Sequence, residues 1–218
     1  MESTGRGASR AGSRSFPSYK GDALIERTVA SPYPERMIHA ALPVFTIGHS
    51  SRPLEVFLGL LAESRIACVV DVRRLPGSRS FPQYNADALA ASLSASGIDY
   101  WHVPALCGRR TVGELDGVPP ENFWSNASFA RYAAHARSAT FANGLDELVQ
   151  RSARQRCALM CSEAVWWRCH RRIIADHLIA RGEQVVHIMG PGQVVAGSLT
   201  RGAAIDGLDV VYPPAGAA

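Results

Sequence analysis

The sequence predicts a three-layer α/β domain of Rossmann-like or flavodoxin-like type, with a mostly parallel sheet of about five strands. Two features of the chain predict it. From Val44 onward, short apolar runs of strand length alternate with longer helical patterns, and parallel strands joined by crossover helices require this alternation. Polar residues follow directly after these apolar runs, and such sheets bind their ligands beyond the carboxyl ends of the strands.

Each element of this fold can be assigned to a stretch of the chain. The apolar runs predicted as strands cover residues 44–47, 67–72, 100–103, 157–160 and 184–188. Pro53 is placed to begin the first helix, and Gly97 and Gly182 are placed to end the second and the last. The predicted helices cover residues 53–63, 87–96, 129–136, 143–154 and 168–180.

The chain is expected to divide into three parts. Residues 1–42 are rich in Gly, Ser, Arg, Ala and Pro and show no sustained period, which predicts a flexible N-terminal tail. Residues 43–204 form the predicted α/β domain, in which the chain after Gly190 wraps over the core. Residues 205–218 are predicted to be a C-terminal tail.

The tail contains a copy of a segment from the predicted domain. Residues 12–24 and residues 77–89 share the pattern G-S-R-S-F-P-x-Y-x-x-D-A-L. We hypothesise that the tail copy competes for the place of the internal copy, within one chain or between two chains. The alternative is a duplication without a role.

Arginine carries almost all of the positive charge. Of 23 basic residues only Lys20 is a lysine, and the formal net charge is +4. Forked guanidinium groups favour the recognition of phosphate and carboxylate, although a GC-rich coding sequence produces the same bias. The arginines are scattered without a long basic stripe, which argues against a nucleic-acid-binding module, one alternative function.

The cysteines predict a reducing, cytoplasmic location. The chain has five, an odd number, and no secretory signal pattern at its start. Cys68 and Cys157 lie in predicted strands and are expected to be core residues. No apolar run reaches the roughly 20 residues that cross a bilayer, so no membrane partner is expected.

Thiol, carboxylate, imidazole and guanidinium groups follow the predicted strands. Cys161 or Cys169 is a candidate reactive thiolate, because positive charge and a helix N-terminus lower a thiol pKa. Glu163 is the alternative working carboxylate, and His49 or His170 is the candidate proton carrier. These five residues are the predicted catalytic group. The predicted substrate-binding residues are Ser50, Asp71, Arg73, Ser78, Arg79, His102 and Arg171.

Several of these residues have a second interpretation. Strand alternation puts Asp71 and Arg73 on the same side of the chain, where they form either a loop-ordering ion pair or part of an anion clamp. Cys161 and Cys169 with His170 or His187 have acceptable types for a metal site, but the short-spaced cysteine pair typical of zinc is missing. We therefore assign no metal ligands from the sequence. The neighbouring Trp166 and Trp167 either stack on a base or pack into the core.

The strand-end residues described above, with the residues around them, resemble the DUF488 family over roughly residues 44–204. The resemblance implies a Rossmann-like fold and an enzymatic site, without naming a reaction. Cys107 departs from the family pattern, because similar members have Gly there, and the added side chain would disturb a close backbone approach. The motifs that carry the resemblance are Thr46–Ser50, Asp71–Arg73, Ser78–Arg79, Tyr100, His102, Cys161, Glu163, Cys169–Arg171 and His187–Ile188.

The expected function is an enzyme with a thiol and carboxylate site. Its expected ligand is an anionic, nucleotide-like or small phosphate-bearing substrate. The alternatives are a nucleic-acid-binding module without catalysis and a cysteine-based redox or metal site. No cofactor is identified from the sequence.

Overall fold

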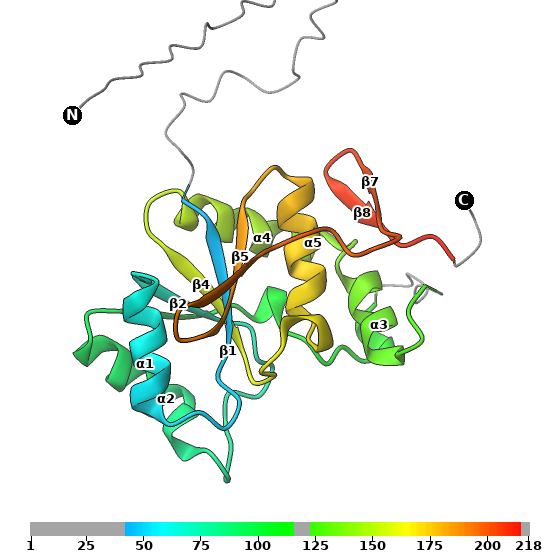
Figure 1. The fold of residues 1–218 in the computed structure, drawn as a ribbon. Coiled ribbons are helices and arrows are strands. Elements are labelled where there is room, and N and C mark those ends of the chain that lie inside the picture. The colour runs from blue at the N-terminus through cyan, green and yellow to red at the C-terminus, as the bar shows by residue number, and fades with distance from the viewer. Residues whose placement is uncertain (1–41, 116–122, 215–218) are drawn as a thin grey trace, which may run out of the picture. The chain divides into compact units, whose positions relative to one another are not determined.

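The computed structural model describes residues 42–115 and 123–214 (Figure 1). Its centre is a six-stranded sheet in the order β3-β2-β4-β1-β5-β6. Strands β1 to β5 run parallel, and β6 joins β5 antiparallel. A separate hairpin of β7 and β8 follows. The strands are β1 (Val44–Gly48), β2 (Cys68–Asp71), β3 (Asp99–His102), β4 (Cys157–Cys161), β5 (Val185–Gly190), β6 (Gln193–Ala196), β7 (Ala204–Asp206) and β8 (Asp209–Val211).

The predicted α/β class and the mostly parallel sheet are confirmed. All five predicted strands are present, and their ends differ from the prediction by one or two residues. The sheet is consistent with a Rossmann-like fold in which β1 and β4 have exchanged places relative to the order 3-2-1-4-5-6. The exchange places β4 beside β2 and β1 beside β5. β1 and β4 remain neighbours, and their last residues, Gly48 and Cys161, are register partners.

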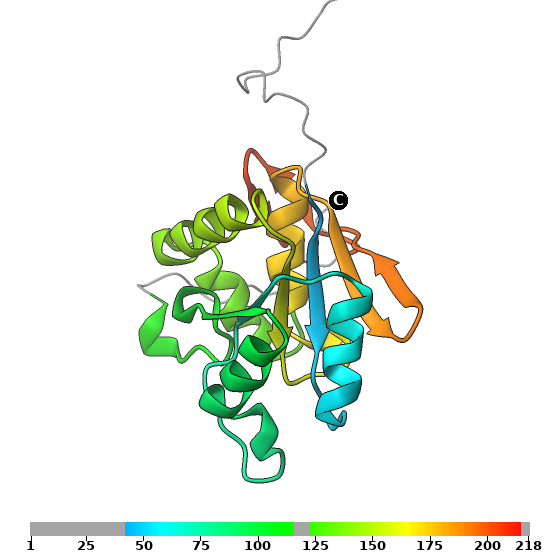
Figure 2. The ribbon, with the colours of Figure 1, turned by 90° about the vertical axis from the view of Figure 1, so that its left-hand side faces the viewer.

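Helices cover both faces of the sheet (Figures 1 and 2). Phe45 and Ile47 of β1 pack in one apolar cluster with residues of α1 and α2, whereas Val70 and Leu159 pack in a second cluster with residues of α3, α4 and α5. This alternation is that of parallel strands buried on both sides. The helices are α1 (Leu54–Glu63), α2 (Ala86–Ala95), α3 (Ala127–His135), α4 (Ala139–Ser152) and α5 (Arg171–Ala180).

Two helices begin earlier than predicted because polar side chains cap them. Asn126 accepts a hydrogen bond from the backbone N–H of Ser128 and starts α3, and Ser138 accepts one from Phe141 and starts α4. Such caps satisfy backbone donors that the first helical turn leaves unpaired. The periodicity of apolar residues, which predicts starts at 129 and 143, does not register the caps that precede these first turns.

The chain after Gly190, predicted to wrap over the core, contains regular structure that the sequence did not predict. It forms β6 at the sheet edge and the β7-β8 hairpin. Tyr212 is buried, and its hydroxyl donates to Asp176 of α5 at 2.8 Å. Residues just beyond 204 therefore pack on the domain, although the boundary proposed at that residue stays a prediction. Residues 1–41, which include the copy of residues 77–89, lie outside the described residues.

None of the described helices is long and apolar enough to cross a membrane.

His177 on α5 lies where a charged ring is unfavourable. Its side chain is 1% exposed, its ring contacts Phe141 edge-on at 5.0 Å, and its Nε2 has no hydrogen-bond partner among the described residues. Burial, together with the charge of Arg181, lowers its pKa from 6.5 to about 4. Because the folded pKa lies below the unfolded one, the neutral ring stabilises the fold above pH 6.5. That contribution is lost as the pH falls from 6.5 toward 4.

His177→Leu is therefore expected to resist mild acid better than the wild type. Between pH 7.5 and pH 5 the wild type should lose about 2 kcal/mol more unfolding free energy than the variant, because only the wild-type unfolded chain gains the extra proton. Urea unfolding at the two pH values measures this difference. Equal losses in both proteins would show that His177 does not contribute to acid sensitivity.

Candidate functional site

A pocket of about 610 Å³, termed the site pocket, opens at the carboxyl ends of the central strands. Segments that follow β1, β2, β3 and β4 all contribute to its wall. The predicted residues were expected to meet at this edge, and most of them do. Those that line the site pocket are His49, Ser50, Arg73, Ser78, Cys161, Glu163, Cys169 and His170.

Four predicted substrate-binding residues do not line the site pocket. Asp71 and Arg171 are buried beside it, and His102 donates from Nε2 to the backbone carbonyl of Arg73 at 2.9 Å. Each of these three supports a side chain or backbone of the pocket wall. Arg79 is exposed outside the pocket lining.

Arg73 is held rigidly by a carboxylate at the end of β2. Asp71 is fully buried, and Arg73 is 6% exposed. The guanidinium donates from Nε to Oδ1 at 2.9 Å and from Nη2 to Oδ2 at 2.6 Å, and the Tyr100 hydroxyl donates to Oδ2 at 2.7 Å. Burial lowers the pKa of Arg73, but the hydrogen bonds and charge of Asp71 outweigh burial and raise it. Arg73 therefore keeps its charge at the pocket wall.

His49 is neutral, and both of its ring nitrogens are occupied. Its Nδ1 lies 2.9 Å from the carbonyl of Ser50, which can only accept, so Nδ1 carries the proton. Nε2 then accepts from Nη1 of Arg73 at 3.2 Å, and the ring stacks on Tyr84 at 4.1 Å. Burial, reinforced by the charge of Arg73, lowers its pKa to about 4. This arrangement favours positioning of Arg73 over the predicted proton transfer.

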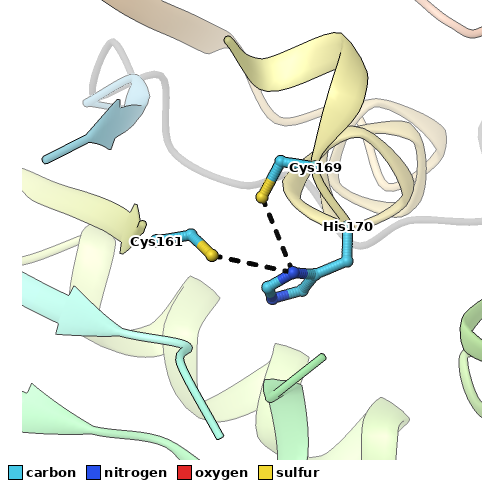
Figure 3. Close-up of side chains that lie close together, drawn as sticks. All are labelled: Cys161, Cys169 and His170. Atoms are coloured by element: carbon cyan, nitrogen blue, oxygen red, sulfur yellow. Dashed lines mark hydrogen bonds between the residues drawn. The ribbon is translucent and has the colours of Figure 1, made fainter. Parts of the chain in front are cut away.

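Two thiols and an imidazole meet at one end of the site pocket (Figure 3). This thiol–imidazole trio consists of Cys161, Cys169 and His170. Nε2 of His170 lies 3.1 Å from the carbonyl of Val72 and must donate to it, so in the neutral ring Nδ1 is an acceptor. Nδ1 lies 3.6 Å from the sulfur of Cys169 and 3.9 Å from that of Cys161. The imidazole thus presents its basic nitrogen to both sulfurs.

The two sulfurs have different electrostatic surroundings. Burial raises the pKa of Cys169, but the Cys161 thiol and the nearby Arg171 guanidinium outweigh burial and lower it to about 6. Arg171 donates from Nε to the Cys169 sulfur at 3.3 Å. The hydrogen bond to Cys169, followed by burial, raises the pKa of Cys161 to about 12. Cys169 is therefore the more readily ionised of the two thiols.

Cys169 and His170 precede α5 instead of forming its first turn, so the predicted helix start at 168 is wrong. Trp166–Arg168 forms the short 3-10 helix η4, and Cys169 has the extended dihedrals φ −128° and ψ 149°. His170 is the N-cap residue of α5. This extended step turns the Cys169 sulfur back toward Cys161, which a continuous helix would not do.

The close backbone approach expected near Cys107 occurs at the next residue. A Cβ on Gly108 would lie 2.7 Å from Nδ1 of His170, so a side chain there would displace the ring. Cys107 is itself buried, and its sulfur lies 3.2 Å from the carbonyl of Arg73. The Cys107 side chain is therefore accommodated outside the pocket lining.

Several pocket residues are absent from the predicted site. Arg109 has a positive φ of 56°, a strained conformation that clusters at functional sites. The predicted residue Ser50 shares it, with φ 48°. Arg109 and Arg168 add exposed positive charge to the wall. The only indication of these two arginines in the sequence was that arginines follow a predicted strand. The other unpredicted polar or aromatic residues of the lining are Ser51, Arg74, Phe81, Asn126, Ser128, Phe129, Tyr132 and Ser162.

The tryptophan pair divides into one packed and one exposed ring. Trp166 stacks on His187 at 4.2 Å with an interplanar angle of 8°, whereas Trp167 is 47% exposed. His187 also lies 2.8 Å from the hydroxyl of Thr46 through its Nδ1. His187 therefore packs against Trp166 and Thr46 and is not part of the trio.

Among the described residues, the trio is the group whose possible metal-ligand atoms lie close together, all within 4.8 Å of one another.

Comparison with known proteins identifies the family. A family model described as "Domain of unknown function DUF488" matches residues 53–178, more than half of the chain. The matched residues include Arg73 and the whole thiol–imidazole trio. The searches of curated proteins and of solved structures gave no significant match. The chain belongs to the DUF488 family.

Proposed function

We propose that this protein is an enzyme that binds a small anionic, phosphate-bearing or nucleotide-like substrate in the site pocket and acts on it with the thiol–imidazole trio. One observation carries the proposal. A buried, rigidly held arginine and a cluster of two thiols and an imidazole line the same pocket. Its volume lies within the range of about 300–1,000 Å³ typical of small-molecule sites.

Arg73 is prepared to bind an anion. The guanidinium has five N–H groups. Asp71 accepts from the one on Nε and from one on Nη2, and His49 accepts from one on Nη1. Among the described residues, one N–H on each terminal nitrogen is left for a ligand. Because Asp71 and His49 fix the plane of the guanidinium, little side-chain entropy is lost when it binds an oxyanion.

The trio supplies the reactive groups. A sulfur with an imidazole acceptor in reach is the arrangement of a nucleophilic site, and the same three atoms are ligands for a soft divalent cation. Glu163 is exposed at the same wall and supplies a carboxylate for proton transfer. Both kinds of chemistry would act in the pocket that Arg73 also lines.

Arg73→Gln is expected to weaken the binding of phosphate and of AMP at least tenfold, because two charge-assisted hydrogen bonds are lost. Isothermal titration calorimetry measures the affinity. Arg79→Gln is the matched control, since the same change is made at an exposed residue outside the pocket lining. Arg73→Lys keeps the positive charge but loses the forked guanidinium. It therefore shows whether weaker binding reflects lost anion contacts or a loss of the fold. Equal affinities in all four proteins would contradict the assignment of Arg73.

Turnover is tested with a mixture of small phosphorylated compounds and nucleotides followed by mass spectrometry. The wild type should consume at least one component, and His170→Gln should not. A wild type that binds no phosphate, sulfate or nucleotide and consumes nothing overturns the proposed function.

A further inference from the structure

We propose that Cys161, Cys169 and His170 form a zinc site with three protein ligands, whose fourth coordination position faces the site pocket. The chain has no short-spaced cysteine pair of the kind typical of zinc sites. Spacing in the folded chain is different, since β4 and the turn before α5 bring the three ligands together. The metal site does not depend on the proposed function, but its catalytic use rests on it.

The distances between the ligand atoms match a tetrahedral zinc site. With Zn–S of about 2.3 Å and Zn–N of about 2.0–2.1 Å, tetrahedral angles place sulfur and nitrogen about 3.6 Å apart and the two sulfurs about 3.8 Å apart. Nδ1 of His170 lies 3.6 Å from Cys169 Sγ and 3.9 Å from Cys161 Sγ, and all three atoms lie within 4.8 Å. Small side-chain rotations are therefore sufficient to bind the ion.

The surroundings of the three ligands are those of a prepared metal site. The carbonyl of Val72 accepts from Nε2 of His170 at 3.1 Å and so leaves Nδ1 as the ligand atom. Metal-binding histidines characteristically donate their other N–H to such an oxygen. Tyr132 contacts the same ring edge-on at 4.8 Å, and Gly108 lies against it on the pocket side. The imidazole is therefore held in one orientation before any ion binds.

The charges of the site favour an anionic fourth ligand. A zinc ion with two thiolates is neutral, and the buried Arg171, which donates to the Cys169 sulfur, leaves a net charge of +1. No carboxylate forms an ion pair with Arg171 in the described part of the chain. Hydroxide or a substrate oxygen at the fourth position would neutralise this charge, and a nearby cation also favours ionisation of the bound water.

Three protein ligands and an open position distinguish a catalytic zinc site from a structural one. Among the described residues no further Cys, His, Asp or Glu joins the trio, and all three ligands line the site pocket. The corresponding reaction class is hydrolysis of an anionic substrate held by Arg73. The oxygen of the bound hydroxide bonds to the electrophilic atom, the bond to the leaving group breaks, and the proton from the original water ends on the leaving group.

Metal analysis of the full chain, purified under reducing conditions without chelators, tests the site. The wild type should contain close to one zinc per chain, and Cys161→Ser, Cys169→Ser and His170→Gln should each retain less than a tenth of it. Cys107→Ser is the matched control, because this buried thiol lies beside the pocket but outside the trio. It should keep its zinc. Circular dichroism of each variant checks that the fold is retained.

Cobalt titration of the metal-stripped wild type gives a readout that needs no variant to fold. Cobalt should produce thiolate-to-metal charge-transfer absorption that zinc abolishes. If the wild type carries no zinc and binds neither ion, or if the trio variants keep full zinc content, the metal site is wrong. Arg73-dependent anion binding without metal would leave the proposed function standing, whereas zinc binding without any anion binding or turnover would overturn the function and keep the site.

Discussion

Asp71→Asn is expected to lower the free energy of unfolding by about 3–5 kcal/mol, because it leaves the buried guanidinium of Arg73 without its counter-charge. Asp71 is fully buried and takes hydrogen bonds from Nε and Nη2 of Arg73, from the backbone N–H of Arg73 and from Tyr100. The guanidinium also loses its fixed orientation, so phosphate binding should weaken. Urea unfolding and isothermal titration calorimetry measure the two effects.

Two further variants distinguish the ion pair from simple packing. Tyr100→Phe removes one hydrogen bond to Asp71 but leaves the ion pair, so it should cost only about 1.5–3 kcal/mol and preserve anion binding. The double variant Asp71→Asn with Arg73→Gln removes both charges and should be more stable than Asp71→Asn alone. A double variant with the sum of the two single losses would argue against an ion pair as the source of the effect.

Gly48→Ala is expected to destabilise the protein by about 3 kcal/mol or more, because the added methyl has no space. A Cβ on Gly48 would lie 1.9 Å from the carbonyl oxygen of Glu163, 2.7 Å from its carbonyl carbon and 2.9 Å from the Cα of Ala164. All three are backbone atoms, so no side-chain rotation relieves the overlap. The chain after β4 must move, and with it the geometry between Cys161 and His170.

Gly59→Ala is the matched control for this prediction. Gly59 is an exposed residue within α1, and a Cβ there meets nothing within 4 Å. The same substitution should raise the unfolding free energy by about 0.5–1 kcal/mol, because alanine favours the helix. Thermal and urea unfolding of the two variants should therefore give shifts of opposite sign. A Gly48→Ala protein with wild-type stability and metal content would contradict the close approach of β1 and the chain after β4.

Local chemistry explains which elements could be predicted. The runs that became β2 and β4 are apolar and short, and Pro53 and Gly97 stand at helix ends. Periodicity and end residues are properties of neighbours in the chain, so they can be recognised without the fold. The starts of α3 and α5 differ because caps and a 3-10 turn decide them, and these depend on single hydrogen bonds.

The site was partly predictable for the same reason. Residues that end parallel strands share one edge of the sheet, so Arg73 and Cys161 could be expected to meet. The order of the strands in the sheet could not be expected, because it depends on contacts between segments far apart in the sequence. The exchange of β1 and β4 makes Asp71 a register partner of Met160, the residue before Cys161.

Residue types and spacing alone thus indicated the α/β class, the DUF488 resemblance and the polar strand ends, since each depends on residues that are close together in the sequence. Only tertiary structure decided which polar groups face the pocket and which support them from behind. Asp71 and Arg171 have the same chemical types as ligand-binding residues, but both are buried beside Arg73 and Cys169. The physical reason is that a charge is paired by whatever lies within a few ångströms in space, and that neighbourhood exists only after folding.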